Sequence, residues 1–340
     1  MGTAPRYDPS EQSFSDLSGE RVLVFGGTGF LGRHVCAALR SAGARVVTVS
    51  RNAPAGGTPD DSVPMDLASA TEAELVRLVH DHAPRVVINA AGRAHGGEPS
   101  ELLAVNAEAV ERLAHALPAA PEPPRLVHLG SIHEYGTGEV GTGFLEDGPT
   151  RPVGAYAAAK LRATLAVIEA VRTRGLDGTV LRIGNVVGPG APRQSLLGTV
   201  AHSLVEAAER ARTSGERPRL RLTPLRAQRD FVDVRDVAEA VLAAATAPLA
   251  SVRGRVVNVG CGRAIPVRQA VERMIALSGA PLDIVERASE TGRSDPRWQR
   301  MDIGAAGELL SWRPRRDLER SLSDLLEEAR RSRERRTAAE

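Results

Sequence analysis

Residues 21–32 read Arg-Val-Leu-Val-Phe-Gly-Gly-Thr-Gly-Phe-Leu-Gly and join a short apolar run to a cluster of glycines. The apolar run has the character of a strand that is buried on both faces of a parallel sheet. Beyond it, Leu31, Val35 and Leu39 recur at the spacing of one face of a helix. The stretch therefore predicts a strand, a glycine-rich turn and a helix in direct succession.

A strand, turn and helix of this kind can hold the pyrophosphate of a dinucleotide. Gly26 permits the tight turn, Gly29 lets the backbone approach the ligand, and Gly32 lets the helix pack closely on the sheet. The positive end of the helix dipole attracts the anion. A glycine-rich turn without a ligand is the alternative. The turn residues that we expect at the cofactor are Gly26, Thr28, Gly29, Phe30, Leu31 and Gly32.

The end of the second predicted strand, at residues 45–49, indicates which dinucleotide binds. Sites that prefer NAD place an acidic residue here for the ribose hydroxyls, whereas this chain has Ser50 and Arg51. Because a guanidinium can pair with a 2′-phosphate, we expect NADP(H); the alternative is a solvated Arg51. Further residues expected at the cofactor are Asp66 and Leu67 beside the adenine, and Ala90, Ala91 and Gly92 beside the ribose and pyrophosphate.

Strands and helices alternate through the first half of the chain, which predicts an α/β fold with a Rossmann-type, doubly wound parallel sheet. After Gly190 the rhythm changes, and we expect a smaller C-terminal α/β substrate lobe over the end of the sheet. The predicted divisions are a disordered leader at 1–19, a dinucleotide-binding domain at 20–190, a mainly substrate-binding lobe at 191–330 with some chain returning to the sheet, and a charged tail at 331–340.

Composition narrows the class of protein. The 340 residues carry a formal net charge of +2 and only 3% aromatic residues, which argues against nucleic-acid binding. No apolar run reaches the roughly 20 residues of a membrane helix, and the N-terminus does not resemble a signal peptide. Cys36 and Cys261 lie far apart and indicate neither a disulfide framework nor a zinc site. We expect a cytoplasmic protein without a bound metal.

Lys160 is the only lysine in a chain with 44 basic Lys and Arg residues. Tyr156 precedes it by four positions, so in a helix the two side chains share one face. An ammonium beside a phenol favours the phenolate, and we therefore expect Lys160 to lower the pKa of Tyr156. The pair is a candidate for proton transfer near neutral pH. A solvated helix with this common spacing is the alternative.

Several motifs occur in a fixed order along nearly the whole chain, from about Arg21 to Arg330. They are the glycine turn at Gly26, Ser131 with Tyr156 and Lys160, the segment Leu-Arg-Ile-Gly-Asn-Val-Val-Gly-Pro at 181–189, the segment Arg-Asp-Phe-Val-Asp-Val-Arg-Asp-Val at 229–237, and Trp-Arg-Pro at 312–314. Together they resemble the extended branch of the short-chain dehydrogenase/reductase family, the NAD-dependent epimerase/dehydratase group.

The resemblance implies a role for each matching residue. Ser131 would hydrogen-bond the reacting oxygen, Tyr156 would exchange a proton with it, and Lys160 would hold the nicotinamide ribose. Asn106 matches a family asparagine behind the site. The residues implied in substrate binding are Asn185 and Arg229 at the diphosphate, with an ordinary surface ion pair as the alternative for Arg229, and, less firmly aligned, Arg293. His133 is expected at the sugar; His95 is a second loop histidine, and for both histidines a loop position without a chemical role remains open.

The loop after Ser131 argues against 4,6-dehydration as the reaction. In 4,6-dehydratases of the family an Asp-Glu pair follows the catalytic hydroxyl residue, whereas this chain has Ile132 and His133, with Glu134 one position later. The loop and the Gly184–Gly190 segment also resemble nucleotide-diphosphate-hexose 4-ketoreductases of bacterial deoxysugar pathways, which supply sugars for glycosylated natural products. The resemblance thus implies NADPH-dependent reduction of the C4 ketone of a dTDP-4-keto-6-deoxyhexose.

Two other functions stay open. An NAD-dependent nucleotide-sugar epimerase of the same fold is one, and a non-catalytic NADP-binding sensor is the other. The long Ala-rich helices predicted at 99–117 and 155–174 match those that pair across a two-fold axis in related proteins. We therefore expect a homodimer.

Overall fold

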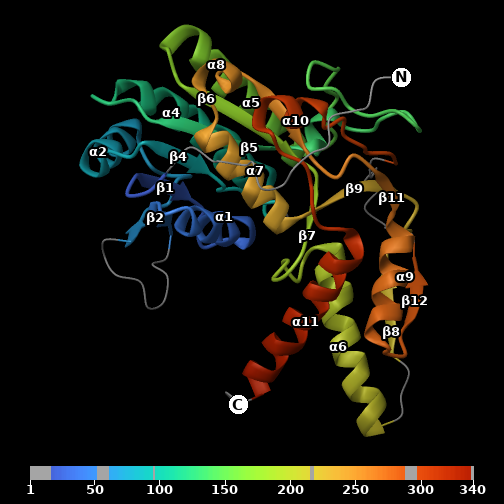
Figure 1. Cartoon of the computed structure of the whole chain (residues 1–340). Helices are drawn as coiled ribbons and strands as arrows, with labels where there is room; N and C mark the ends of the chain where they lie inside the picture. The colour runs from blue at the N-terminus through green and yellow to red at the C-terminus, as the bar shows by residue number, and fades with distance from the viewer. Residues whose placement is uncertain (1–16, 52–60, 95, 215–217, 288–296, 338–340) are drawn as a thin grey trace, which may run out of the picture.

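A parallel sheet of seven strands forms the centre of the molecule (Figure 1). The computed structural model describes residues 17–51, 61–94, 96–214, 218–287 and 297–337. Across the sheet the strands are β10 (Val256–Val259), β6 (Gly178–Ile183), β5 (Arg125–Ser131), β4 (Val86–Asn89), β1 (Arg21–Phe25), β2 (Arg45–Ser50) and β3 (Ser62–Pro64). Every neighbouring pair is parallel. The Rossmann-type fold expected from the alternation is confirmed.

Helices cover both faces of this sheet because its strands are apolar on both sides. One face packs against α1 (Phe30–Ser41), α7 (Val234–Thr246) and α10 (Gly304–Leu310). The other packs against α2 (Glu72–His82), α4 (Ala109–Ala116) and α5 (Ala155–Arg174). The strand order reverses between β1 and β4, which is where sheets of this kind bind ligands, at the carboxyl ends of the strands.

A smaller lobe lies beyond that edge of the sheet (Figure 1). Its three helices share an apolar core: α6 (Leu196–Ser214), α9 (Val267–Ser278) and α11 (Leu318–Thr337). Its two small sheets are β11 (Ala264–Pro266), β9 (Gln228–Asp233) and β7 (Asn185–Val187), and β12 (Asp283–Glu286) with β8 (Arg219–Leu222). The short helix α8 (Leu249–Val252) leads from α7 back to β10 in the large sheet.

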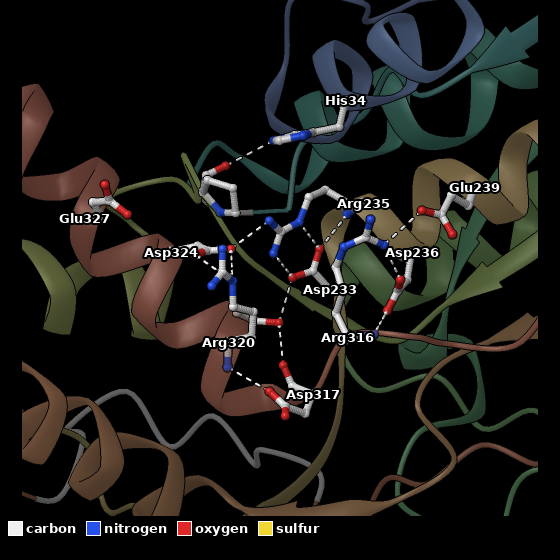
Figure 2. Close-up of polar contacts among 12 residues, drawn as sticks. His34, Asp233, Arg235, Asp236, Glu239, Arg316, Asp317, Arg320, Asp324 and Glu327 are labelled. Carbon is white, nitrogen blue, oxygen red and sulfur yellow. Dashed lines mark hydrogen bonds and ion pairs between the residues drawn. The ribbon is translucent and has the colours of Figure 1, made fainter. Parts of the chain in front are cut away.

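Polar contacts fasten α11 to the start of α7, as Figure 2 shows. The Asp233 carboxylate caps α7 by accepting from the backbone N–H of Arg235 at 2.8 Å, and it also accepts from the Ser321 hydroxyl at 2.7 Å. The Arg235 guanidinium bridges Asp233 and Asp324 at 2.7 and 2.6 Å. Because these groups are half-buried or buried, the network sets how the smaller lobe meets the sheet.

Three differences from the predicted elements are local. The predicted leader ends too late, because Leu17 is buried in the core; residues 1–16 lie outside the described part of the chain. The predicted helix at 99–117 is broken into α3 (Pro99–Leu103), a π-helical turn η3 (Ala104–Glu108), α4 and a short 3-10 turn η4 (Leu117–Ala119). The last helix runs on through part of the predicted tail to Thr337.

Candidate active site

A cavity of about 1070 Å³ extends from the glycine turn to the smaller lobe. Gly29 to Gly32 line one end, and Arg229 and Phe231 on β9 line the other. Ser131, Tyr156 and Lys160 lie along its wall at the carboxyl edge of the sheet. The fold therefore brings the three predicted catalytic residues together with both predicted binding regions.

The glycine turn fits a dinucleotide pyrophosphate. A Cβ at Gly32 would lie 2.0 Å from the Gly26 carbonyl oxygen, and Gly26 has a φ of +73°. No side chain of the described residues caps α1 at Gly29, and Phe30 and Leu31 at the start of the helix line the cavity. The uncapped backbone N–H groups of this first turn suit an anion. Gly26 and Thr28 shape the turn but do not line the cavity.

Strand β5 and helix α5 position the three catalytic candidates. Ser131 ends β5, and its hydroxyl lies close enough to the Tyr156 phenol to lower the pKa of that phenol. Lys160 is buried, with only 4% of the residue exposed, and its ammonium donates to the carbonyl oxygen of Leu129 on β5. The His133 ring meets the Tyr156 ring edge-on, with centroids 6.0 Å apart. The geometry presents a phenol and a hydroxyl side by side to a ligand in the cavity.

The expected lowering of the Tyr156 pKa is wrong, because burial outweighs any effect of the neighbouring ammonium. Burial raises the pKa of the Tyr156 phenol; the Ser131 hydroxyl opposes this rise, and the Glu134 carboxylate adds to it. Lys160 bonds Leu129 instead of the phenol, and burial lowers its own pKa to about 8, with Glu134 acting in the opposite direction. Tyr156 is thus held protonated, which suits a proton donor.

The loop after β4 forms the wall beside α1. Ala90, Ala91 and Gly92 line the cavity, as does Asn106 on the π-helical turn. The Asn106 amide is bound to backbone: its oxygen accepts from Arg93 N at 3.1 Å and its nitrogen donates to Arg93 O and Leu102 O at 3.0 and 2.9 Å. Asn106 therefore holds the loop in place.

Four predicted cofactor residues lie away from the cavity wall. They are Ser50 and Arg51 at the end of β2, and Asp66 and Leu67 after β3. Strands β2 and β3 are paired, which brings the two groups to the same edge of the sheet. Arg51 is exposed there. The neighbouring residues 52–60 lie outside the described part of the chain.

The predicted substrate residues line the opposite end of the cavity. His133, Asn185 and Arg229 all contribute to its wall. Arg229 is only 5% exposed, and the Asn185 amide donates to Asp230 O at 3.2 Å. Arg293 and His95 lie outside the described residues.

The sequence interpretation missed a buried ion pair next to Ser131. The Glu134 carboxylate accepts from Ser131 N at 2.8 Å and from Arg182 Nε at 2.8 Å. Glu134 and Arg182 are 0% and 4% exposed. The Ser-x-x-Glu spacing at 131–134 is a capping-box signature and could have indicated the first of these bonds. The pairing with Arg182 had no signal in the sequence.

The described ranges contain neither a candidate metal centre nor a candidate membrane span. Within them, no group of three or more His, Cys, Asp or Glu side chains is arranged to hold a metal ion. Their helices are all too short or too polar to cross a bilayer. Cys36 and Cys261 are both free thiols.

Known proteins share this fold and much of this sequence. The sequence model of the NAD dependent epimerase/dehydratase family matches residues 22–260, so the chain belongs to this family of NAD(P)-dependent enzymes. It is 43% identical, over 90% of its length and 94% of the relative's, to a dTDP-6-deoxy-L-talose 4-dehydrogenase (NAD(P)+) of Kitasatospora kifunensis.

Two other relatives share most of their length with this chain. A UDP-glucose 4-epimerase of Azospirillum brasilense is 30% identical over 87% of this chain and 88% of its own. The solved structure of MoeE5 with UDP-glucuronic acid and NAD is 28% identical and has a TM-score of 0.74, covering 92% of this chain and all of the other. The family thus includes both dehydrogenases and epimerases that act on nucleotide sugars.

Proposed function

We propose that this protein reduces the C4 ketone of a dTDP-4-keto-6-deoxyhexose with NADPH and also catalyses the reverse oxidation. The observation that carries the proposal is one cavity in which Tyr156 and Ser131 lie between the glycine turn and Arg229. The relative with 43% identity is named for oxidation at C4 of a dTDP-6-deoxy sugar, which is the same reaction in reverse. In both directions the same groups must handle one hydride and one proton.

A reduced nicotinamide held in the cavity would supply the hydride to C4. The Tyr156 phenol gives its proton to the carbonyl oxygen as that oxygen becomes an alkoxide, and the Ser131 hydroxyl donates a hydrogen bond to the same oxygen. The raised pKa of Tyr156 keeps the phenol protonated before the step. The Lys160 ammonium would bind the ribose of the cofactor and stabilise the phenolate that is left.

The remaining contacts to substrate and cofactor are assigned to charged and polar side chains. Arg229 and Asn185 would bind the diphosphate of the sugar nucleotide, because a guanidinium recognises phosphate through two parallel hydrogen bonds. Arg51 would bind the 2′-phosphate that distinguishes NADPH from NADH. His133 would contact the sugar, and Arg293 remains a predicted second diphosphate contact. The reduced sugar would serve the glycosylation of a natural product, in the cytoplasm.

The test follows NADPH absorbance with freshly prepared dTDP-4-keto-6-deoxy sugars, and the product is identified by NMR. We expect NADPH oxidation and a 6-deoxyhexose with a new C4 hydroxyl. Tyr156→Phe should slow the step by about 10²–10⁴, the usual contribution of a positioned general acid. Wild-type turnover by this variant, or no reaction of the folded wild-type protein with any such sugar, would refute the proposal.

An epimerase is the second candidate, favoured by the 30% identical UDP-glucose 4-epimerase. An epimerase reduces and oxidises its cofactor within one cycle, so purified protein would contain tightly bound NAD and would not consume NADPH. A non-catalytic NADP-binding sensor would bind the cofactor and show no turnover at all. The absorbance assay and analysis of the released cofactor separate the three functions.

We also propose a homodimer built on α4 and α5. Leu165 on α5 is 59% exposed, which is a large apolar side chain to leave in water on a helix whose other large apolar side chains are buried or half-buried. A second copy of the chain would cover it. Light scattering should give twice the chain mass, and Leu165→Arg should shift the mass toward that of one chain. A monomeric wild type would contradict the dimer.

A further inference from the structure

The buried ion pair of Glu134 and Arg182 connects the reactive end of β5 to the neighbouring strand β6. Glu134 lies in the 3-10 turn η5 (Ile132–Tyr135), directly after Ser131, and Arg182 lies near the end of β6. Ionised groups this deeply buried are rarely tolerated unless they are paired and hydrogen-bonded. Neither residue lines the cavity.

Both oxygens of Glu134 are engaged by groups that cannot take part in the reaction. Oε1 accepts the backbone N–H of Ser131, and Oε2 accepts from Arg182 Nε, each at 2.8 Å. The carboxylate also lies over Gly130, where a Cβ would approach Oε1 to 2.7 Å. The residue before Ser131 is thus a glycine at the point where this carboxylate needs the space.

Arg182 is itself held from three sides. Its guanidinium carbon lies 4.4 Å from the centroid of the Tyr135 ring, and Nη1 donates to Glu146 O at 3.1 Å. The Tyr135 hydroxyl donates to Asn258 Oδ1 at 2.8 Å, and Asn258 lies on β10, on the far side of β6. The ion pair is therefore part of a connected set of polar contacts behind the reacting groups.

We propose that Glu134 and Arg182 are positioning residues, which hold Ser131 in reach of Tyr156 and place a fixed negative charge behind Tyr156 and Lys160. This assignment rests on the proposed function, because it names residues that support the proposed proton transfer. Glu134 is not the acid or base of the reaction in this scheme. Glu134, which stands one position later than the Asp-Glu pair of the dehydratases, thus has a structural role.

The charge of Glu134 affects the pKa values of groups at the cavity, and the region between them is buried. It raises the pKa of Lys160 and that of Tyr156. The Leu129 carbonyl and the buried His128, both on β5, also lie near the Lys160 ammonium. Of these, Glu134 is the group whose removal changes the local charge while leaving the cavity wall intact.

Glu134→Gln is the first variant, because glutamine can still accept the Ser131 N–H but carries no charge. We expect kcat for the ketosugar to fall about 10²-fold, the effect of a displacement of about 1 Å at a reacting centre, with little change in KM. The matched control is Asp177→Asn. Asp177 pairs with Arg125 Nε at 2.9 Å and bridges the same two strands at their other end, far from the cavity.

Lys160 offers a second readout that does not depend on turnover. Since the chain has one lysine, lysine labelled at its terminal carbon or nitrogen gives a single NMR signal. Glu134→Gln should lower the pKa of that lysine below the wild-type value, and Asp177→Asn should leave it unchanged. An inactive wild type would refute the proposed reaction, while the shift in the lysine pKa would still decide the positioning role.

Removing one partner of a buried ion pair can unfold a protein. The double variant Glu134→Gln/Arg182→Gln leaves no lone buried charge and serves where the single variant does not fold. We expect it also to show a low kcat and a lowered lysine pKa. Either variant with wild-type kcat, or with an unchanged lysine pKa, would overturn the proposal.

Discussion

Lys160 lies one helical turn after Tyr156 on α5, and its ammonium donates a hydrogen bond to the carbonyl oxygen of Leu129 on β5. The only lysine of the chain is therefore anchored to the central sheet. Its charge is buried beside the cavity, with a carboxylate behind it at Glu134. The compact ammonium fits a position where a planar guanidinium would need more room and more acceptors.

The first prediction concerns the titration of Lys160. Burial lowers its pKa to about 8, so the single lysine NMR signal should move between its charged and neutral positions near that pH. Between pH 8 and the ordinary lysine range the unfolded chain binds more protons than the folded one, so this residue's contribution to stability rises with pH there. A titration midpoint above 10 would contradict the buried position.

Lys160→Arg should lower kcat/KM about 10²-fold, because the larger planar group displaces the reacting geometry by about an ångström. Because the variant keeps the positive charge, a loss of activity measures the effect of the changed shape and hydrogen bonding. Arg162→Lys is the converse exchange on the same helix, at an exposed residue paired with Glu111, and should leave activity unchanged. Full activity of Lys160→Arg would show that any cation suffices at this position.

Arg51→Ala tests the choice of cofactor. If Arg51 binds the 2′-phosphate, the variant should raise KM for NADPH about 10- to 100-fold, since hydrogen bonds to charged groups contribute about 1.5–3 kcal/mol. KM for NADH should not change. Arg45→Ala, at the opposite end of β2, is the control. Equal KM values for NADPH in the wild type and in Arg51→Ala would exclude this role.

Gly32→Ala should disrupt the nucleotide turn, because the new Cβ would lie 2.0 Å from the Gly26 carbonyl oxygen. We expect a loss of about 1–3 kcal/mol in the free energy of unfolding, the usual cost of overpacking, and weaker NADPH binding measured by fluorescence. Gly307→Ala in α10, whose nearest contact would be 3.6 Å away, is the matched control. Unchanged binding by Gly32→Ala would argue against this geometry.

The sequence alone was sufficient for elements that depend on local rules. The helix predicted at 155–174 is observed at Ala155–Arg174, and the glycine turn lies between β1 and α1 as expected. The helix predicted at 99–117 is interrupted because the Asn106 side chain bonds the Leu102 and Arg93 backbone around the π-helical turn. The hydrogen bond from Asn106 to Arg93 depends on a loop 13 residues away, and helical periodicity does not reveal it.

The sequence by itself determined the alternation of strands and helices in the first half of the chain, the glycine turn, and the residue types Ser131, Tyr156 and Lys160 at their spacing, because backbone conformation and helical faces follow from neighbouring residues. Only the tertiary structure decided that Arg182 pairs with Glu134 and that the pKa of Tyr156 is raised. Both depend on burial, which is produced jointly by β5, β6 and α5 once the chain has folded.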